Sequence, residues 1–316
     1  MLQDRSILVL GAGELGMAML RSLARHPRVR GGTALAVLVR QSTIDSQGSG
    51  KQKDMAELRA LGVELVPGDL AAQSVDALAG VFGRFETVIS CTGFVGGSGV
   101  QLKIAKAVLL AGVPRYFPWQ FGVDYDAIGR GSPQDLFDEQ LDVRALLRSQ
   151  DATEWVIVST GMFTSFLFEP SFGVVDLANA TVHALGSWDT AVTVTTAADI
   201  GALTTEIVFA EPRIARQVVY VAGDTVTYRQ LADALDAMLD LTVHRVTWSV
   251  PQLTGELARD PGNPLRKYRA VFAQGVGVAW DKAHTFNAQR GLAVSDLEAW
   301  MHTNLLASNR HPVPQN

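Results

Sequence analysis

The sequence predicts a doubly wound α/β fold, in which a parallel sheet carries helices on both faces, with a smaller α/β subdomain after it. Through the first half of the chain, short apolar runs of strand length alternate with segments whose apolar residues recur at helical spacing. Glycine-rich turns follow the first and the fourth of these runs. Because strand, helix and strand in succession form a crossover unit, this alternation favours a parallel sheet.

The predicted strands and helices alternate in order along the first 160 residues. The strands are expected at 6–10, 34–39, 63–67, 86–93, 115–122 and 154–160. The helices that lie between them are expected at 17–26, 54–62, shortly after 70, and at 100–112 and 132–150. Residues 41–53 are polar and contain glycine and lysine, so we expect a loop there.

After Gly161 the alternation weakens, which indicates a second and smaller region at 161–316. Residues 162–176 are aromatic and irregular, and the next predicted element is a helix that starts near Asp199. Further strands are expected at 217–223 and 244–250, and further helices at 228–239 and 295–307. The boundary is soft, and segments of the two regions are allowed to interleave.

Composition and charge exclude several classes of protein. The net charge of −5 and the scattered Lys and Arg residues do not form the basic footprint of a nucleic-acid-binding protein. No apolar run approaches about 18 residues, and the first residues do not form a signal peptide, so we expect a cytoplasmic protein that does not bind membranes. Cys91 is the single cysteine and the six histidines are dispersed, so we expect neither a disulfide nor a metal site.

Three glycines between the first strand and the first helix form a G-x-G-x-x-G turn. Gly11 permits the tight turn, Gly13 lets the backbone approach a diphosphate, and Gly16 brings helix and strand together. The diphosphate would then meet free N–H groups at a helix N-terminus, which includes Glu14 and Leu15. This context predicts a Rossmann-type dinucleotide-binding domain at 1–160. The alternative is an ordinary glycine-containing turn.

The residue that ends the second strand indicates which dinucleotide is bound. A carboxylate at this position accepts a hydrogen bond from the ribose 2′-hydroxyl of NAD, whereas a guanidinium pairs with the 2′-phosphate of NADP. Here the residue is Arg40, and Lys51 or Lys53 could add positive charge from the following loop. The sequence therefore favours NADP(H), and the alternative is a solvated strand-end arginine.

Three further segments, 63–70, 101–124 and 154–163, resemble the NmrA-like and isoflavone-reductase-like branch of the atypical short-chain dehydrogenases. The similarity runs from about Ile7 to Gly201. It implies an NADPH-binding Rossmann domain followed by a small C-terminal subdomain that binds substrate. In the enzymes of this branch a hydride is transferred to aromatic substrates, whereas other members are NADP-sensing regulators without turnover.

The resemblance also implies which residues approach the cofactor. The turn after the fourth strand, Ser90 to Gly93, falls beside the cofactor ribose, and 117–122 falls on the family element F-x-P-S-E-F-G. In this chain Trp119 and Gln120 replace the serine and the glutamate of that element. Besides the glycine turn and Arg40, the candidate cofactor-binding residues are Cys91, Thr92, Gly93, Pro118, Trp119, Gln120 and Phe121.

Gln140 occupies the position at which the reductases of this branch carry a catalytic lysine, one turn before an arginine that Arg144 matches. An amide donates and accepts hydrogen bonds but does not titrate. The chain also lacks the Tyr-x-x-x-Lys pair of ordinary short-chain dehydrogenases. Gln140 shares a helical stripe with Leu136, Val143 and Leu147, so it is expected to face inward. There it either packs against backbone groups or lines the cleft.

Other candidates for the site lie further along the chain. Tyr125 or Asp124 could donate a proton, or Gln140 could hold a water molecule that does so. Asp199 resembles a family position but fits a helix N-cap as well. The candidate substrate-binding residues, whose aromatic members could instead be core, are Trp119, Gln140, Met162, Phe163, Phe166 and Trp188.

Taken together, the sequence predicts an NADPH-dependent reductase of the isoflavone-reductase-like type that acts on a small apolar or aromatic carbonyl or enone. Two alternatives stay open because the lysine is replaced. One is a regulator that senses NADP(H) and reports to a protein partner, and the other is a cyclase or isomerase that uses the retained pocket without redox chemistry. Substrate identity and oligomeric state are not determined.

Overall fold

The structure is a computed structural model that describes residues 5–308, and its chain forms two compact units. Unit 1 comprises 1–121, 136–158 and 200–219, and unit 2 comprises 122–135, 159–199 and 220–316. The chain therefore passes between the two units five times. The two units are described separately below.

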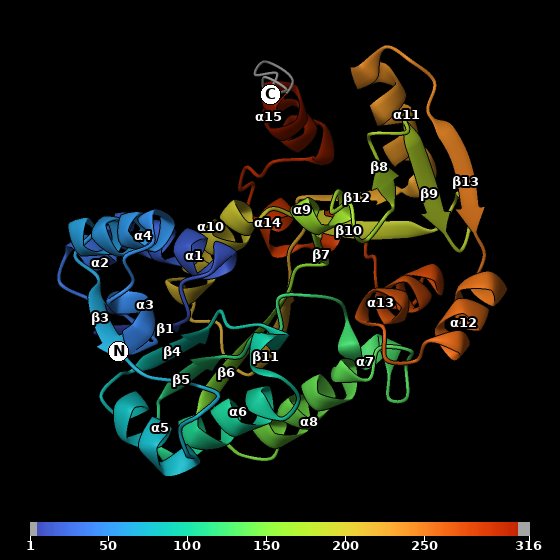
Figure 1. Ribbon diagram of the computed structural model, residues 1–316. Helices are drawn as coiled ribbons and strands as arrows, with labels where there is room; N and C mark the ends of the chain where they lie inside the picture. Colours follow the sequence, from blue (N-terminus) through green and yellow to red (C-terminus); the bar gives the residue numbers. More distant parts are fainter. Residues whose placement is uncertain (1–4, 309–316) are drawn as a thin grey trace. The chain divides into compact units, whose positions relative to one another are not determined.

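Unit 1 is built on a seven-stranded sheet (Figure 1), which confirms the predicted doubly wound α/β fold. Every strand pair from β3 to β6 whose register is given is parallel. In spatial order the strands are β11 (Gln217–Tyr220), β6 (Glu154–Ser159), β5 (Arg115–Phe117), β4 (Thr87–Ser90), β1 (Ser6–Leu10), β2 (Ala34–Val39) and β3 (Glu64–Pro67).

The direction in which the chain adds strands reverses at β1. This strand pairs with β2 on one side and with β4 on the other, with Leu10 opposite both Leu38 and Ser90. From β1 the chain first builds outward to β3 and then returns to add β4, β5 and β6. Such a reversal leaves a crevice outside the carboxyl ends of the strands, where open α/β sheets bind ligands.

Alternate residues of the strands pack on the two faces of the sheet, as the two-residue period of a strand requires. Leu8 and Leu10 belong to the core cluster that includes Leu78, Ile104 and Val143 from the helices of one face. Figure 1 shows α5, α6 and α8 on this side of the sheet and α1 and α4 on the other. The helices of unit 1 are α1 (Glu14–Arg25), α2 (Pro27–Arg30), α3 (Gln41–Ile44), α4 (Ser49–Ala60), α5 (Val75–Phe82), η1 (Phe94–Gly96), α6 (Val100–Leu110), α8 (Leu136–Arg148) and most of α10 (Ala197–Val208).

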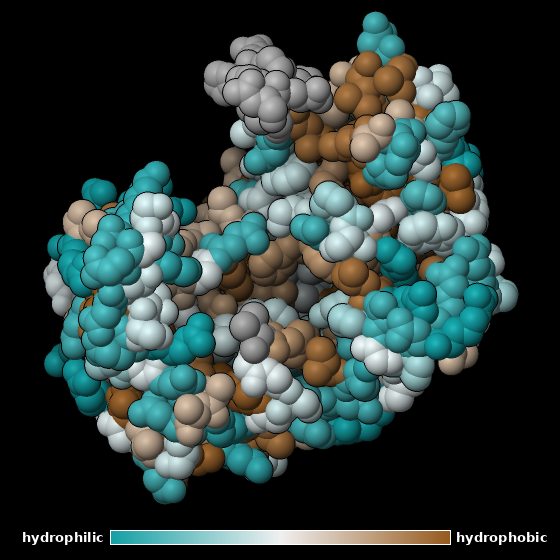
Figure 2. Space-filling model, in the orientation of Figure 1, coloured by the Kyte–Doolittle hydropathy of each residue, from teal (hydrophilic) through white to brown (hydrophobic). Residues whose placement is uncertain are grey.

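The prediction of a loop at 41–53 is wrong, because most of these residues are helical. This stretch contains α3 and the first turns of α4, with Gly48 as the residue that precedes α4. Only Met55 and Leu58 of α4 are buried, and both lie in its second half. The surface over α2 and α4 is mainly hydrophilic in Figure 2. A helix with so narrow an apolar contact gives almost no periodic signal in its sequence.

Unit 2 contains two three-stranded sheets and several short helices. One sheet has the order β12 (Asp224–Thr227), β10 (Ala191–Thr195) and β7 (Met162–Phe163), and the other has the order β13 (His244–Trp248), β9 (Thr181–Leu185) and β8 (Val175–Asp176). The helices are α7 (Tyr125–Ile128), α9 (Thr164–Leu167), α11 (Tyr228–Leu239), α12 (Val250–Arg259), α13 (Pro264–Ala273), η2 (Lys282–His284), α14 (Phe286–Gln289) and α15 (Leu297–Ser308).

The sequence predicted no strand between Gly161 and the helix near Asp199, and this expectation is wrong. Strands β7, β8, β9 and β10 all lie in this stretch. Two of them have only two residues each. So short a strand has no measurable period, and its pairing depends on partners far away in the sequence.

Among the described residues, no helix is long and apolar enough to cross a membrane.

A buried arginine joins two parts of unit 1. Arg115 of β5 is fully buried, and its guanidinium donates hydrogen bonds to the carbonyl oxygens of Val208 at 2.6 Å and Ile214 at 2.8 Å. The same guanidinium lies 4.9 Å from the ring centre of Phe117. Val208 is the last residue of α10, so the cation satisfies carbonyl groups at the negative end of that helix.

We expect Arg115→Met to lower the free energy of unfolding by about 3 kcal/mol, because buried carbonyl oxygens lose their donor. Urea titration followed by tryptophan fluorescence measures this loss. The matched control is Arg84→Met, since Arg84 is exposed and paired with Glu64 at 3.3 Å, and its change is expected to stay below about 1 kcal/mol. Equal losses in the two variants would contradict this account of Arg115.

Candidate cofactor and substrate site

The turn that follows β1 can be formed only with glycine at its first position. Gly11 has a φ of +92°, a region that side-chain-bearing residues rarely adopt. A Cβ atom there would lie 2.6 Å from Oγ1 of Thr92, which follows β4. The N–H of Gly11 donates to the carbonyl oxygen of Leu38 at 3.0 Å. The turn is thus held between the strands on both sides of β1.

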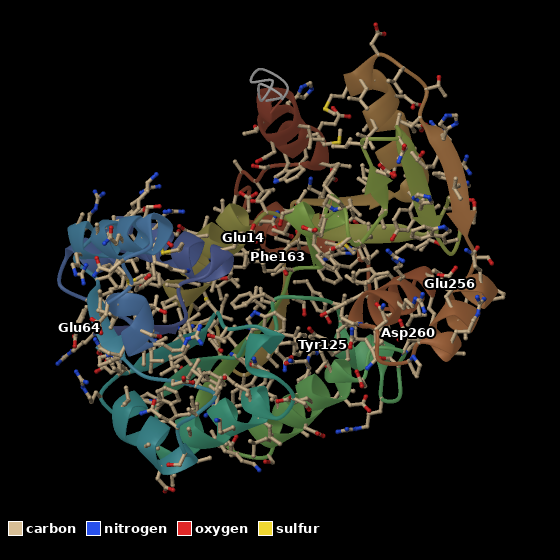
Figure 3. The ribbon with its side chains drawn as sticks, in the orientation of Figure 1. Glu14, Glu64, Tyr125, Phe163, Glu256 and Asp260 are labelled. Carbon is tan, nitrogen blue, oxygen red and sulfur yellow. The ribbon has the colours of Figure 1, made fainter. Side chains whose placement is uncertain are left out.

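Of the other two glycines of the turn, Gly16 brings helix and strand together as predicted, and Gly13 borders open space. A Cβ atom on Gly16 would lie 2.1 Å from the carbonyl oxygen of Gly11, so α1 packs directly on the turn. A Cβ atom on Gly13, by contrast, would meet nothing within 4 Å. Gly13 precedes α1, whose first residue Glu14 is labelled in Figure 3, and its place as N-cap brings no side-chain hydrogen bond. Open space at an uncapped helix N-terminus, followed by buried Leu15, suits a diphosphate.

Arg40 ends the neighbouring strand β2 and is exposed. It forms no ion pair with any residue of the described chain, and its positive charge helps to lower the pKa of Asp69. The main cause of that lower pKa is hydrogen bonding from the backbone N–H groups of Ala72 and Ala71. Asp69 follows β3 and was not predicted from the sequence. Lys51 and Lys53, which were predicted to lie in a loop, belong to the exposed face of α4.

Buried side chains fix the turn that follows β4. Thr92 Oγ1 donates to the carbonyl oxygen of Leu10 at 3.0 Å. The amide of Gln101, which is nearly fully buried on α6, donates to the carbonyl oxygens of Thr92 at 2.7 Å and Gly93 at 2.9 Å. Burial raises the pKa of the Cys91 thiol far above its usual value, so this thiol stays protonated. The role of Gln101 could not be predicted, because the surrounding sequence indicates a helix but not which loop the side chain contacts.

Trp119, which follows β5, packs against the same turn. Its ring lies edge-on to Phe94, with 4.6 Å between the ring centres. A Cβ atom on Gly93 would lie 3.1 Å from the Trp119 ring. Trp119 is partly exposed, whereas Gln120 is fully buried and Phe121 nearly so. The structure therefore brings the candidate residues after β4 and β5 together.

A buried polar chain connects the turn after β5 with α8. Arg144 Nε donates to Gln120 Oε1 at 2.6 Å, and Gln120 Nε2 donates to the carbonyl oxygen of Gln140 at 2.9 Å. All three side chains are fully buried. The amide of Gln120 thus provides an acceptor for the arginine and a donor for the backbone of α8.

The side-chain amide of Gln140 differs from its neighbours. Neither Nε2 nor Oε1 has a hydrogen-bond partner within the described chain, although the side chain is fully buried. The predicted inward-facing position is confirmed, since Val143 and Leu147 are buried on the same side of α8 while Leu136 is half-buried. A buried amide without partners is costly unless a ligand or a water molecule satisfies it.

Glu139 precedes Gln140 on α8 and is a further buried polar residue that the sequence did not reveal. Its side chain is buried, and its carboxylate accepts from the N–H of Gly99 at 2.8 Å and of Leu102 at 3.0 Å. These N–H groups belong to the first turn of α6, where no preceding residue supplies a side-chain cap. The carboxylate therefore satisfies orphan donors at the positive end of α6, which makes its burial favourable.

In unit 2, the two candidate proton donors, Tyr125 and Asp124, occupy different environments. Tyr125, the first residue of α7 and labelled in Figure 3, is buried. Asp124 Oδ1 accepts from the N–H groups of Asp126 and Ala127, and its Oδ2 accepts from the Tyr220 hydroxyl at 2.8 Å. Asp124 thus acts as an acceptor, and Tyr220 is a polar partner that the sequence did not reveal.

The candidate substrate-binding residues of unit 2 do not form a single cluster of ring contacts. Phe166 stacks on Phe172 with 4.6 Å between ring centres and lies edge-on to Tyr268. Met162 is buried, and Phe163, labelled in Figure 3, is half-buried at the start of α9. Trp188 lies in the turn between β9 and β10, where the guanidinium of Arg245 lies over its ring at 5.8 Å. None of the described ring pairs joins Trp188 to Phe166.

Asp199 was predicted as a helix N-cap, but it belongs to the first turn of α10. Thr196 precedes the helix, and its Oγ1 accepts from the N–H of Asp199 at 3.0 Å and donates to the Asp199 carboxylate at 2.6 Å. Thr196, three residues before Asp199, is therefore the residue that caps α10, and the Asp199 carboxylate accepts a hydrogen bond from it. Among the described residues, no cluster of His, Cys, Asp and Glu could hold a metal ion.

The two glycines that flank the start of α1 give a first test of this geometry. Gly13→Ala should leave the melting temperature of the free protein unchanged within about 2 °C, because its Cβ has open space and its φ is negative. Gly16→Ala should lower stability by about 3 kcal/mol or prevent folding, since its Cβ meets a backbone oxygen. Calorimetry of the two variants measures the difference, and equal melting temperatures would contradict the packing of α1 on the turn.

Two fully buried glutamines give a second test. Gln140→Leu should leave the free energy of unfolding unchanged or raise it by up to about 2 kcal/mol, because an unpartnered amide leaves the interior. Gln101→Leu should lower it by about 2 kcal/mol, because two carbonyl oxygens lose their donor. Urea titration compares the two. A loss at Gln140 as large as that at Gln101 would show that its amide is already satisfied in the free protein.

Comparisons with known proteins agree with this architecture. Residues 3–276 match the model of the NmrA-like family. A protein of Gibberella moniliformis (strain M3125 / FGSC 7600) named NmrA-like family domain-containing oxidoreductase is 48% identical over 297 residues, which cover 94% of this chain and 97% of that protein. Eugenol synthase 1 of Petunia hybrida is 24% identical over 268 residues, or 82% of each chain.

Solved structures show the same fold. A crystal structure of isoflavone reductase superposes with a TM-score of 0.77 at 18% identity and covers 95% of this chain and 99% of that one. The binary complex of leucoanthocyanidin reductase with NADPH from Vitis vinifera gives a TM-score of 0.78 at 17% identity, with the same coverage. The family match and the 48% identical relative together show that this chain belongs to the NmrA-like family.

Proposed function

We propose that the protein is an NADPH-dependent reductase that acts on a small apolar or aromatic carbonyl or enone. The observation that carries this proposal is the open position at Gly13, directly before the uncapped N-terminus of α1 and beside the end of β2. A Cβ atom would occupy this space, so a glycine here suits the close approach of a diphosphate.

The residues around this position fit each part of the cofactor. The backbone of the turn from Gly11 to Gly16 would hold the diphosphate, and Arg40 would pair with the 2′-phosphate. The residues from Cys91 to Gly93 and from Pro118 to Phe121 would shape the nicotinamide end. When bound, NADPH supplies a hydride, while the protein provides orientation and exclusion of water.

The similar proteins support both the cofactor and the reaction type. The 48% identical relative is named an oxidoreductase, and the leucoanthocyanidin reductase structure is a complex with NADPH. A reductase named AtPrR2 has been solved with NADP⁺ and (+)-pinoresinol, an aromatic small molecule. These names favour an aromatic substrate for this chain as well.

A carbonyl reduction also requires a proton, and the family's lysine is not present to deliver it. Gln140 does not titrate, but its unpartnered amide can orient a substrate oxygen or hold a water molecule that donates the proton. Tyr125 is the other donor that we propose. Within unit 2, the half-buried side chains of Phe163, Phe166 and Tyr268 offer apolar surface for a substrate, and Met162 and Phe172 are buried.

The replacement of lysine by Gln140 also favours a second candidate function, a regulator that binds NADP(H) and reports its redox state to a protein partner. Such a protein needs the glycine turn and Arg40 but no proton donor. A pocket that catalyses isomerisation or cyclisation without hydride transfer is a related possibility, because an amide can position a substrate without titrating.

The cofactor choice is tested at Arg40. We expect Arg40→Gln to weaken NADPH binding about 30-fold, because charged hydrogen bonds to the 2′-phosphate are lost. NADH has no 2′-phosphate, so its binding should be unchanged. Calorimetric titration measures both affinities. Arg59→Gln, at an exposed arginine near the end of α4, is the control and should bind NADPH as the parent protein does. A parent protein that prefers NADH would refute the assignment.

The reaction itself is tested by single-turnover oxidation of bound NADPH with a panel of aromatic ketones, enones and imines. Turnover by any of these supports a reductase, whereas tight binding without turnover together with a recovered protein partner supports the regulator. The double variant Gln120→Glu/Gln140→Lys restores both residues of the family pattern, and it should raise turnover at least about 10-fold because lysine can donate a proton. An inert double variant that still binds NADPH would favour the regulator or the pocket without redox chemistry.

A further inference from the structure

One edge of a sheet in unit 2 is an unpaired strand. In the order β13, β9, β8, strand β13 has a neighbour on one side only, and Figure 1 draws it as the outer strand next to β9. It pairs with β9 in parallel, with His244 opposite Thr181 and Trp248 opposite Leu185. Four of its five residues are exposed. An exposed strand edge is a template for pairing with another chain.

The register of β13 determines which of its backbone groups face outward. The N–H of His244 donates to the carbonyl oxygen of Ala180 at 2.7 Å, and the carbonyl oxygen of Trp248 accepts from the N–H of Gly186 at 2.9 Å. A parallel ladder uses every second residue, so His244, Val246 and Trp248 bond to β9. The N–H and C=O groups of Arg245 and Thr247 therefore point away from the sheet. Within residues 5–308, no segment pairs with them.

Exposed apolar side chains gather around this edge. Six large hydrophobic side chains of the described chain are exposed, and three of them lie in or next to β13: Leu241, Val246 and Val250. Figure 2 shows hydrophobic residues over the C-terminal end of α11, which leads into β13. Val246 lies at the centre of the strand and is 39% exposed. Contact between water and these exposed apolar side chains is unfavourable, so burying them against a partner would stabilise a complex.

The charge that would normally block such an edge is neutralised within the unit. Natural edge strands are protected by charged side chains or proline, and β13 has no proline. Its arginine, Arg245, is paired with Asp233 at 2.7 Å and with Asp236 at 2.5 Å, both on α11. Hydrogen bonds to both carboxylates raise the pKa of Arg245 and fix its position on the face that α11 covers. Val246, whose side chain lies on the opposite face of the strand, stays exposed.

We propose that the protein forms a homodimer in which β13 pairs antiparallel with β13 of a second copy, with the twofold axis at Val246. Antiparallel partners alternate between pairs that exchange two hydrogen bonds and pairs that exchange none. With the axis at Val246, Arg245 lies opposite Thr247 of the second copy and Thr247 opposite its Arg245, so the outward groups form two hydrogen-bonded pairs. This proposal does not depend on the proposed enzymatic function.

The sequence of β13 is complementary to itself in this register. Val246 meets Val246 of the second copy, where the two apolar side chains cover each other. His244 lies opposite Trp248 of the second copy, a neutral pair beside the contacts that the Trp248 ring makes within one copy with His183 at 4.1 Å and Arg269 at 4.7 Å. No like charges stand opposite each other. Other registers would leave outward groups unpaired, so this one is favoured.

The test is the mass of the full chain in solution, measured by light scattering after gel filtration across a concentration series. The parent protein should have twice the mass of one 34.0 kDa chain. Val246→Lys and Val246→Glu should each raise the dimer dissociation constant at least about 10-fold, because like charges meet at the axis. The control Leu110→Lys, at a 59% exposed residue of unit 1, should remain dimeric.

A mixture of the two charged variants makes the test specific. Lysine and glutamate would meet at the axis, so the mixture should form a heterodimer that neither variant forms with itself. Hydrogen exchange should show the amides of Arg245 and Thr247 protected in the parent dimer and exchanging in either variant. A monomeric parent protein, a Val246→Lys variant that dimerises like the parent, or a mixture that stays monomeric would each overturn the proposal. Circular dichroism confirms that the variants are folded.

Discussion

The close packing of α1 on the turn after β1 is the constraint on which the rest of unit 1 depends. Gly16 leaves no room for a side chain against the Gly11 carbonyl, so the helix begins immediately outside the strand. Its uncapped N-terminus therefore faces the carboxyl edge of the sheet, at the point where strand order reverses. Free backbone N–H groups, rather than charged side chains, give this end of the helix its positive potential.

Buried polar side chains then place the other loops of the same edge. Gln101 holds the turn after β4, Glu139 holds the start of α6, and the Arg144–Gln120 pair connects the turn after β5 with α8. Each of them bonds to backbone groups or to another buried side chain, so the cost of burying it is offset. The Gln140 side chain has no such partners among the described residues, and in this it differs from Gln101, Glu139 and Gln120.

Patterns that act locally could be predicted from the sequence. The glycine turn, the strand-end Arg40 and the inward-facing Gln140 were all found from spacing, because a turn, a strand end and a helix stripe are fixed by neighbouring residues. The short strands of unit 2 and the start of α4 were missed, since their pairing or packing depends on residues distant in the sequence. The same reason explains why Gln101 and Tyr220 were not recognised as partners of loop residues.

The sequence by itself determined the doubly wound sheet and the glycine turn, because periodicity and glycine spacing are properties of contiguous residues, and the resemblance of three segments indicated the family. Only the tertiary structure decided which buried polar groups are satisfied: that Glu139 caps a helix, that Asp199 follows a threonine cap, and that the Gln140 amide has no partner in the described chain. Hydrogen bonding is short-ranged and directional, so it is settled by the distances that folding sets and not by residue type.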